Sequence, residues 1–153
     1  MAGCRIGYAV GNQEVLNILG TLKSHIDYGV FYPIQKAAEM ALTSNLSLLS
    51  DQVNVYEARR DALISGLVKS GWHVPKTAAT MFIWARIPAG WKSRDFAYKL
   101  IEKAGVTVVP GDAFGKQGEG YVRMALVQPV ERLTEAAERI GAFLIDYQIV
   151  AQD

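Results

Sequence analysis

The spacing of hydrophobic residues along the chain predicts helices in its first third and helices alternating with strands in the remainder. Apolar positions that recur every three or four residues indicate helices, and we expect them after Asn12, at 33–43, at 50–70, from Ser93 to Gly105 and at 131–147. Short apolar or β-branched runs indicate strands, and we expect them at 5–10, 81–87, 106–109 and 121–127.

Residues at the ends of the predicted helices support these boundaries. Asn12 and Ser93 precede apolar periods, and a side-chain oxygen at such a position accepts a hydrogen bond from an otherwise unpaired backbone N–H. Gly71 and Gly105 follow the last apolar positions of two helices. Glycine adopts the left-handed conformation that commonly ends a helix, so we expect the chain to turn at both residues.

The predicted elements divide the chain into two unequal parts. Residues 1–49 contain one predicted strand and two helices, which are too few to close a hydrophobic core. Residues 50–153 contain a long helix, at least three strands and two further helices, which suffice for an α+β sandwich. We therefore expect an α/β chain in which 50–153 is a small complete domain and 1–49 is the end of a larger one.

Charge is nearly balanced, with 16 Lys and Arg residues against 15 Asp and Glu residues among 153. Such a chain has no strong field to attract nucleic acid or anionic lipid, and we expect neither partner. Charged residues between apolar positions are expected on solvated helix faces, and Arg59, Arg60 and Asp61 are placed there by the period of the 50–70 helix. Half of the residues are hydrophobic, which is typical of a globular protein.

Cysteine and histidine are too sparse to form a disulfide or a metal site. Cys4 is the only cysteine, and His25 and His73 have no carboxylate or thiol at ligand spacing. The sequence has no uninterrupted run of 18 apolar residues and no leader-like start, so neither a membrane span nor secretion is expected. The absence of a cysteine framework suits a reducing compartment, and we expect a cytoplasmic protein.

Two arginines stand in unusual surroundings. Arg5 lies between Gly3 and Gly7, and a guanidinium there could bind a phosphate or carboxylate or could form an ordinary surface ion pair. Arg123 interrupts the apolar strand at 121–127. A charge in such a strand must be paired, reach water or face a ligand. The spacing leaves a carboxylate clamp and a structural salt bridge equally open.

Four glycines are concentrated in the loop at 110–120, just before Arg123. Glycine-rich loops can bind phosphate through backbone amides. The spacing here matches neither the P-loop nor the dinucleotide fingerprint. We therefore expect a tight connection that leads into the Arg123 strand.

Two segments together carry a family resemblance. Met-Ala-Gly-Cys-Arg-Ile-Gly-Tyr-Ala-Val-Gly-Asn at 1–12 and Val-Pro-Gly-Asp-Ala-Phe-Gly, followed by Gly-Glu-Gly-Tyr-Val-Arg, at 109–123 closely resemble fold-type I, class I/II aminotransferases that use pyridoxal 5'-phosphate. The segments Asp-Tyr-Gly-Val-Phe at 27–31 and Thr-Met-Phe-Ile-Trp at 80–84 resemble the same family. The resemblance implies that 1–49 is the C-terminal remnant of the large cofactor-binding domain, with its trailing strand and helices, and that 50–153 is the small C-terminal domain.

The resemblance also implies roles for individual residues. Arg5 is expected to bind the cofactor phosphate, and Arg123 is expected to bind the α-carboxylate of the substrate. Tyr28, with Phe31 and Tyr32, falls where family members reach toward the partner's active site in a homodimer, and is expected to contact substrate. The family's Schiff-base lysine lies eight residues before the arginine that matches Arg5, hence upstream of this chain.

These implications lead to one main hypothesis and two alternatives. The chain is expected to be part of an aminotransferase that moves an amino group between an amino acid and a 2-oxo acid, and to be inactive by itself. One alternative is a non-catalytic fragment that associates through the apolar faces of 1–49. The other is a parent with lyase, decarboxylase or cyclopropane-forming activity on the same fold, because such enzymes share both arginines.

Overall fold

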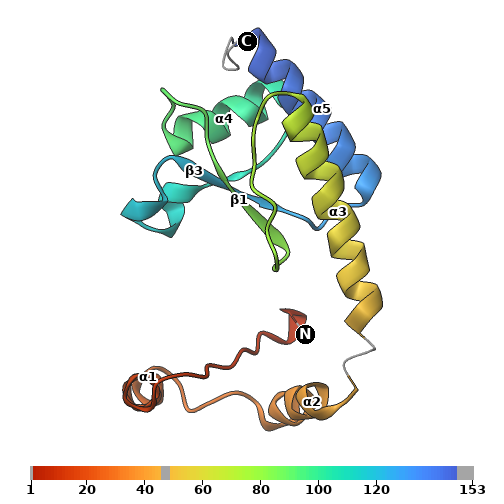
Figure 1. Cartoon of the computed structure of the whole chain (residues 1–153). Coiled ribbons are helices and arrows are strands. Elements are labelled where there is room, and N and C mark those ends of the chain that lie inside the picture. Colours follow the sequence, from red (N-terminus) through yellow and green to blue (C-terminus); the bar gives the residue numbers. More distant parts are fainter. Residues whose placement is uncertain (1, 46–48, 148–153) are drawn as a thin grey trace. The chain divides into compact units, whose positions relative to one another are not determined.

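A computed structural model describes residues 2–45 and 49–147. Residues 1, 46–48 and 148–153, which include both outer ends of the predicted domains, lie outside the described residues. The chain forms two compact units, residues 1–49 and residues 50–153, and Figure 1 colours them along the sequence. Among the described residues, no helix is both long and apolar enough to cross a membrane.

The first unit is helical. Asn12 caps its first long helix as predicted, since its Oδ1 accepts hydrogen bonds from the backbone N–H groups of Glu14 and Val15 at 2.9 and 3.2 Å. Proline occupies the first turn of the second helix, where its missing N–H costs no hydrogen bond. The elements are a short 3-10 turn, η1 (Ala2–Cys4), and the helices α1 (Gln13–Ile26) and α2 (Tyr32–Thr43).

The strand predicted at 5–10 is wrong. Residues 6–10 form an irregular segment, because a strand needs a hydrogen-bonded neighbour and the described strands all belong to the second unit. Neither α1 nor α2 has a buried residue. Apolar side chains such as Val15 and Ile18 are more than 60% exposed, so the described part of this unit closes no core.

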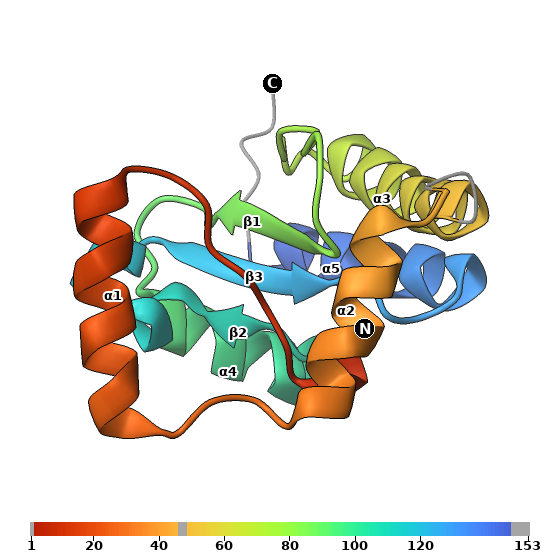
Figure 2. The same cartoon turned by 90° about the horizontal axis from the view of Figure 1, so that it is seen from below.

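The second unit is a three-stranded antiparallel sheet packed against helices. Figure 2 shows β3 between β1 and β2, and Figure 1 shows α3 beside α5. Gly66 lets these two helices approach closely, because a Cβ at that position would collide with the Cβ of Ala137. The elements are α3 (Ser50–Lys69), β1 (Phe82–Arg86), α4 (Ser93–Ala104), β2 (Val109–Pro110), β3 (Tyr121–Ala125) and α5 (Val130–Asp146), with 3-10 turns η3 (Gly111–Phe114) and η4 (Lys116–Gly118) before β3.

One face of the sheet builds the hydrophobic core. Side chains alternate along β1 and β3, so Ile83 and Met124, which are register partners, point to the buried face. Trp84 and Arg123 are also register partners, and they lie on the opposite face. The core contains Leu63, Leu67, Trp72, Val74, Ile83, Ala85, Ile87, Phe96, Ala97, Leu100, Ala104, Val108, Val122, Met124, Leu126, Leu133, Ala137, Ile140, Phe143 and Leu144.

The glycines predicted to end two helices do so, but the strand after Gly105 is shorter than expected. Gly71 and Gly105 have φ of +83° and +64°, which is the left-handed conformation. The strand predicted at 106–109 begins only at Val109. Val106 still donates a backbone hydrogen bond to Leu100 of α4, so the chain completes the helix end before it joins the sheet.

The expectation that Arg60 is solvated is wrong. Its side chain is only 8% exposed. The guanidinium donates to the Asp61 carboxylate at 2.8 Å and to the Thr77 carbonyl at 3.0 Å. The hydrogen bonds from Arg60 and Lys76 hold the pKa of Asp61 below its ordinary value. A long arginine side chain can pack its stem and keep its charge paired, which the helical period alone does not reveal.

Ser93 does not cap α4 with its side chain as predicted. Its buried hydroxyl accepts hydrogen bonds from the backbone N–H groups of Gly120 and Tyr121 at 2.7 and 3.1 Å. The Ser93 backbone N–H donates instead to Glu119 Oε1 at 2.8 Å. Glu119 thus takes the capping role, and the start of α4 is tied to the start of β3. The hydrogen bond from the Ser93 backbone N–H is the largest cause that lowers the pKa of Glu119.

We expect Glu119→Gln to flatten the loss of stability in acid. Because the folded-state pKa of Glu119 lies below its ordinary value of 4.5, the unfolded chain binds more protons than the folded chain as the pH falls below 4.5. The stabilisation is therefore fully present above that pH and is lost as the pH falls through the lower folded-state pKa. Urea unfolding from about pH 6 to about pH 3 measures the slope. If the free energy of unfolding falls with pH equally steeply in Glu119→Gln and in the original chain, this expectation is contradicted. Glu138→Gln, at an exposed position, is the control.

Candidate functional site

Arg123 lies at the centre of the open face of the sheet. It sits in β3, the middle strand, opposite Trp84 of β1 and Val109 of β2, and its side chain is half-buried. The guanidinium carbon Cζ lies 4.2 Å from the ring centroid of Phe82 and 4.5 Å from that of Phe114. Both distances are within the range of a cation–π interaction. Two rings therefore hold the charged end of this arginine.

The rings around Arg123 also support one another. Trp84 stacks on Tyr121 with centroids 5.5 Å apart and an angle of 14° between the planes. It meets Phe114 edge to face at 5.7 Å. Trp84 and Phe114 are 37% and 51% exposed. In the second unit, Arg123 is thus surrounded by aromatic side chains on a face that the unit itself leaves open.

The charge of Arg123 has no carboxylate partner within the part of the chain that the structure describes. No ion pair among the described residues includes it, and its Nε atom is buried without a hydrogen-bond partner. A buried N–H without an acceptor is costly. The salt bridge that the sequence left open is absent from these residues, whereas the guanidinium remains available to a planar anion.

Arg5 adopts a strained backbone conformation. Its φ is +53°, in the left-handed region that residues other than glycine seldom adopt. The side chain is exposed. At Gly3 and Gly7 a Cβ would meet nothing within 4 Å, so the backbone on either side is open to approach. Strained residues are often found at ligand sites, and an exposed guanidinium with open backbone beside it fits a phosphate group.

Tyr28 projects from a turn that the chain builds around Asp27. The Asp27 carboxylate accepts a hydrogen bond from the Gly29 backbone N–H at 2.7 Å and pairs with Lys23. These two hydrogen bonds, that from Lys23 first, lower the pKa of Asp27. Tyr28 itself is fully exposed. Arg5 and Tyr28 belong to the first unit and Arg123 to the second.

The glycine-rich loop before β3 is a tight connection, as the sequence predicts. Gly111 and Gly118 pack against each other, because a Cβ on either residue would collide with the carbonyl oxygen of the other. The loop places Phe114 beside Arg123. Its glycines therefore serve close packing of the backbone.

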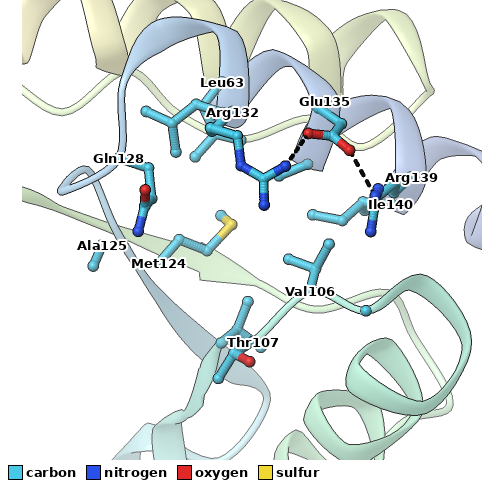
Figure 3. A pocket seen from close by; sticks show the side chains of 14 residues that line it. Leu63, Val106, Thr107, Met124, Ala125, Gln128, Arg132, Glu135, Arg139 and Ile140 are labelled. Carbon is cyan, nitrogen blue, oxygen red and sulfur yellow. Dashed lines mark hydrogen bonds and ion pairs between the residues drawn. The ribbon is translucent and has the colours of Figure 1, made fainter.

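A pocket of about 280 Å³ lies on the core side of the sheet, away from Arg123. Figure 3 shows Met124 and the α5 side chains of Arg132, Glu135 and Arg139 around it. Both arginines pair with Glu135. The hydrogen bond from Arg139 first, and then the charges of Arg132 and Arg139, lower the pKa of its carboxyl. Because both arginines already bond to Glu135, neither guanidinium is as available to an anion as that of Arg123.

Sequence reasoning singled out Arg123 and Arg5 but missed Phe82 and Phe114. The two rings come from β1 and from the loop before β3, and only the strand pairing brings them to one arginine. The alternation of Phe82 and Trp84 on one face of a predicted strand was the available signal. Among the described residues, no three His, Cys, Asp or Glu side chains gather as metal ligands.

Comparisons with known proteins agree on one family. The model of "Aminotransferase class I and II" matches residues 1–140. An LL-diaminopimelate aminotransferase from Halothermothrix orenii is 44% identical over 140 residues, which are 92% of this chain and 36% of that protein. A putative aminotransferase, AatC, from Rhizobium meliloti is 44% identical over 147 residues, 94% of this chain and 36% of its own length.

A solved structure shows the same fold. The aminotransferase from Staphylococcus aureus superposes with a TM-score of 0.78 at 32% identity, over 95% of this chain and 39% of that one. The mixed helix and sheet architecture is therefore that of a part of the aminotransferase fold. The chain spans little more than a third of the length of these relatives.

Proposed function

Because this chain belongs to the class I and II aminotransferases, we propose that it is part of a pyridoxal-phosphate-dependent enzyme that moves an amino group between an amino acid and a 2-oxo acid. Residues 50–153 are its small C-terminal domain. Residues 1–49 are the C-terminal remnant of its large cofactor-binding domain. The full enzyme is a cytoplasmic homodimer in this proposal.

The observation that carries the proposal is the guanidinium of Arg123. It lies on an open aromatic face without a carboxylate partner among the described residues. Amino acids and 2-oxo acids share a carboxylate next to the reacting carbon. An arginine fork binds such a group and orients it. Arg123 therefore binds the α-carboxylate of both substrates.

Arg5 is the residue of this chain that holds the cofactor. Its exposed guanidinium and the open backbone at Gly3 and Gly7 suit the cofactor phosphate. Pyridoxal phosphate, when bound, supplies an electron sink for the carbon that loses its proton. In this proposal, the lysine that binds the cofactor is supplied by the part of the parent enzyme that this sequence does not cover. Tyr28 reaches toward the substrate in the partner subunit's site.

The exposed apolar faces of α1 and α2 support the assignment of 1–49. An exposed face of this kind marks an interaction surface, and the 140 matched residues are only 36% of the length of the relative from Halothermothrix orenii. The rest of the large domain covers these faces in the full enzyme. The same faces support a second candidate, a non-catalytic fragment that self-associates. Light scattering of the 153-residue chain separates them, because a strictly monomeric chain at high concentration would contradict self-association.

The experiment that tests the proposal begins with the gene upstream of residue 1. An in-frame lysine codon four residues before Met1 is expected. The full reading frame is then expressed and assayed with LL-diaminopimelate and common amino acids as donors and 2-oxo acids as acceptors. Amino transfer supports the proposal. β-Elimination or decarboxylation without transfer would assign the parent to another reaction on the same fold.

A further inference from the structure

We propose that Phe82 and Phe114 are positioning residues that present Arg123 to the carboxylate end-on, through its two terminal nitrogens. This inference rests on the proposed function for the identity of the ligand. It specifies which side chains orient the arginine and which of its N–H donors bind the carboxylate. The rings of Phe82 and Phe114 together form an aromatic clamp on the guanidinium.

The aromatic clamp restricts the position of the guanidinium. The Cζ atom lies over both rings, at 4.2 and 4.5 Å from their centroids. Arginine stacks on aromatic faces because its planar group is weakly hydrated there. An unrestrained arginine side chain loses rotamer freedom when it binds a ligand. Stacking in advance of binding removes part of that cost and leaves the terminal donors, on Nη1 and Nη2, open.

The clamp is itself held in place. Phe82 is in β1, and its register partner is Ala125 of β3. Phe114 is half exposed, yet it meets Trp84 edge to face, and Trp84 stacks on Tyr121. The ring that covers Arg123 from the loop is therefore supported by a second pair of rings.

The buried Nε atom determines which donors remain. Nε of Arg123 is buried without an acceptor, so a side-on carboxylate, which uses Nε and one terminal nitrogen, would have to displace what covers it. The terminal nitrogens Nη1 and Nη2 carry four of the five donors of the group. A carboxylate that bonds to both of them forms two parallel hydrogen bonds. End-on binding therefore needs no rearrangement of the clamp.

The kinetic test uses Phe114→Leu in the full enzyme. We expect KM for the amino acid and for the 2-oxo acid to rise together by about 3- to 30-fold, the range of a cation–π contact, while kcat changes less than about 2-fold. Phe114→Tyr keeps a ring and is expected to restore KM. Tyr98→Leu, which removes an exposed ring from α4, is the control. An unchanged KM in Phe114→Leu would overturn the proposal.

A second test reads the arginine directly and does not depend on amino transfer. In NMR spectra of the 153-residue chain, the Nε–H signal of Arg123 is expected upfield because of the ring currents, and Phe114→Leu should move it toward ordinary values. Acetate, compared with chloride at equal ionic strength, should shift the Nη signals of Arg123 and leave Nε–H nearly unchanged. A larger shift at Nε–H, or no shift at either nitrogen, would overturn end-on binding. If the full enzyme transfers no amino group but these signals behave as expected, only the proposed function fails.

Discussion

Arg123→Lys is expected to lower kcat/KM for amino transfer by about 30- to 1,000-fold in the full enzyme. Lysine keeps the positive charge but loses the planar fork that makes two parallel hydrogen bonds. It also loses the stacking on Phe82 and Phe114. The loss of one charge-assisted hydrogen bond and of the cation–π contact together costs about 2–4 kcal/mol, which corresponds to this range of rates. Both half-reactions should suffer, because both substrates carry the carboxylate.

Steady-state kinetics with varied amino acid and varied 2-oxo acid measure the effect. Arg86→Lys is the matched control, since Arg86 lies on the same face of the sheet, opposite Tyr121, and is exposed. We expect the control to stay within about 3-fold of the original enzyme, as surface charges contribute little. If kcat/KM of Arg123→Lys also stays within about 3-fold of the original enzyme, as expected for a surface charge, Arg123 is not the carboxylate-binding residue.

Local signals were sufficient for most of the helices. The cap at Asn12, the proline of the second helix and the period of the last one are read within a few residues, and α1, α2 and α5 begin within one residue of the expected positions. The strand predicted at 5–10 failed because pairing depends on a neighbour far away in the sequence. An apolar run with glycines shows that a segment suits a strand, but not that a partner exists.

The candidate site was predictable only in part for the same reason. A charge inside an apolar strand is visible in the sequence, and it pointed to Arg123. The aromatic clamp arises from the pairing of β1 with β3 and from the path of the loop before β3, which no local pattern encodes. Arg60 and Ser93 were misplaced because each bonds to a residue 17 or more positions away.

Gly118→Ala is expected to lower the free energy of unfolding of the second unit by about 3 kcal/mol, at the upper end of the cost of overpacking. A Cβ at Gly118 would collide with the carbonyl oxygen and carbon of Gly111. Both are backbone atoms that cannot rotate away. The strain falls on the loop that carries Phe114, so the contact of that ring with Arg123 should loosen as well.

Urea unfolding of the 153-residue chain, followed by tryptophan fluorescence, measures this loss where it occurs. The second unit contains all three tryptophans, Trp72, Trp84 and Trp91. The fluorescence signal therefore does not report on unfolding of the first unit. Gly20→Ala is the matched control, because a Cβ there meets nothing within 4 Å and α1 is exposed; it should leave the tryptophan transition unchanged. An unfolding free energy for Gly118→Ala within about 0.5 kcal/mol of the original chain, the usual range of surface substitutions, would mean that the two glycines are not in close contact. The loop would then need another explanation for how it holds Phe114 against Arg123.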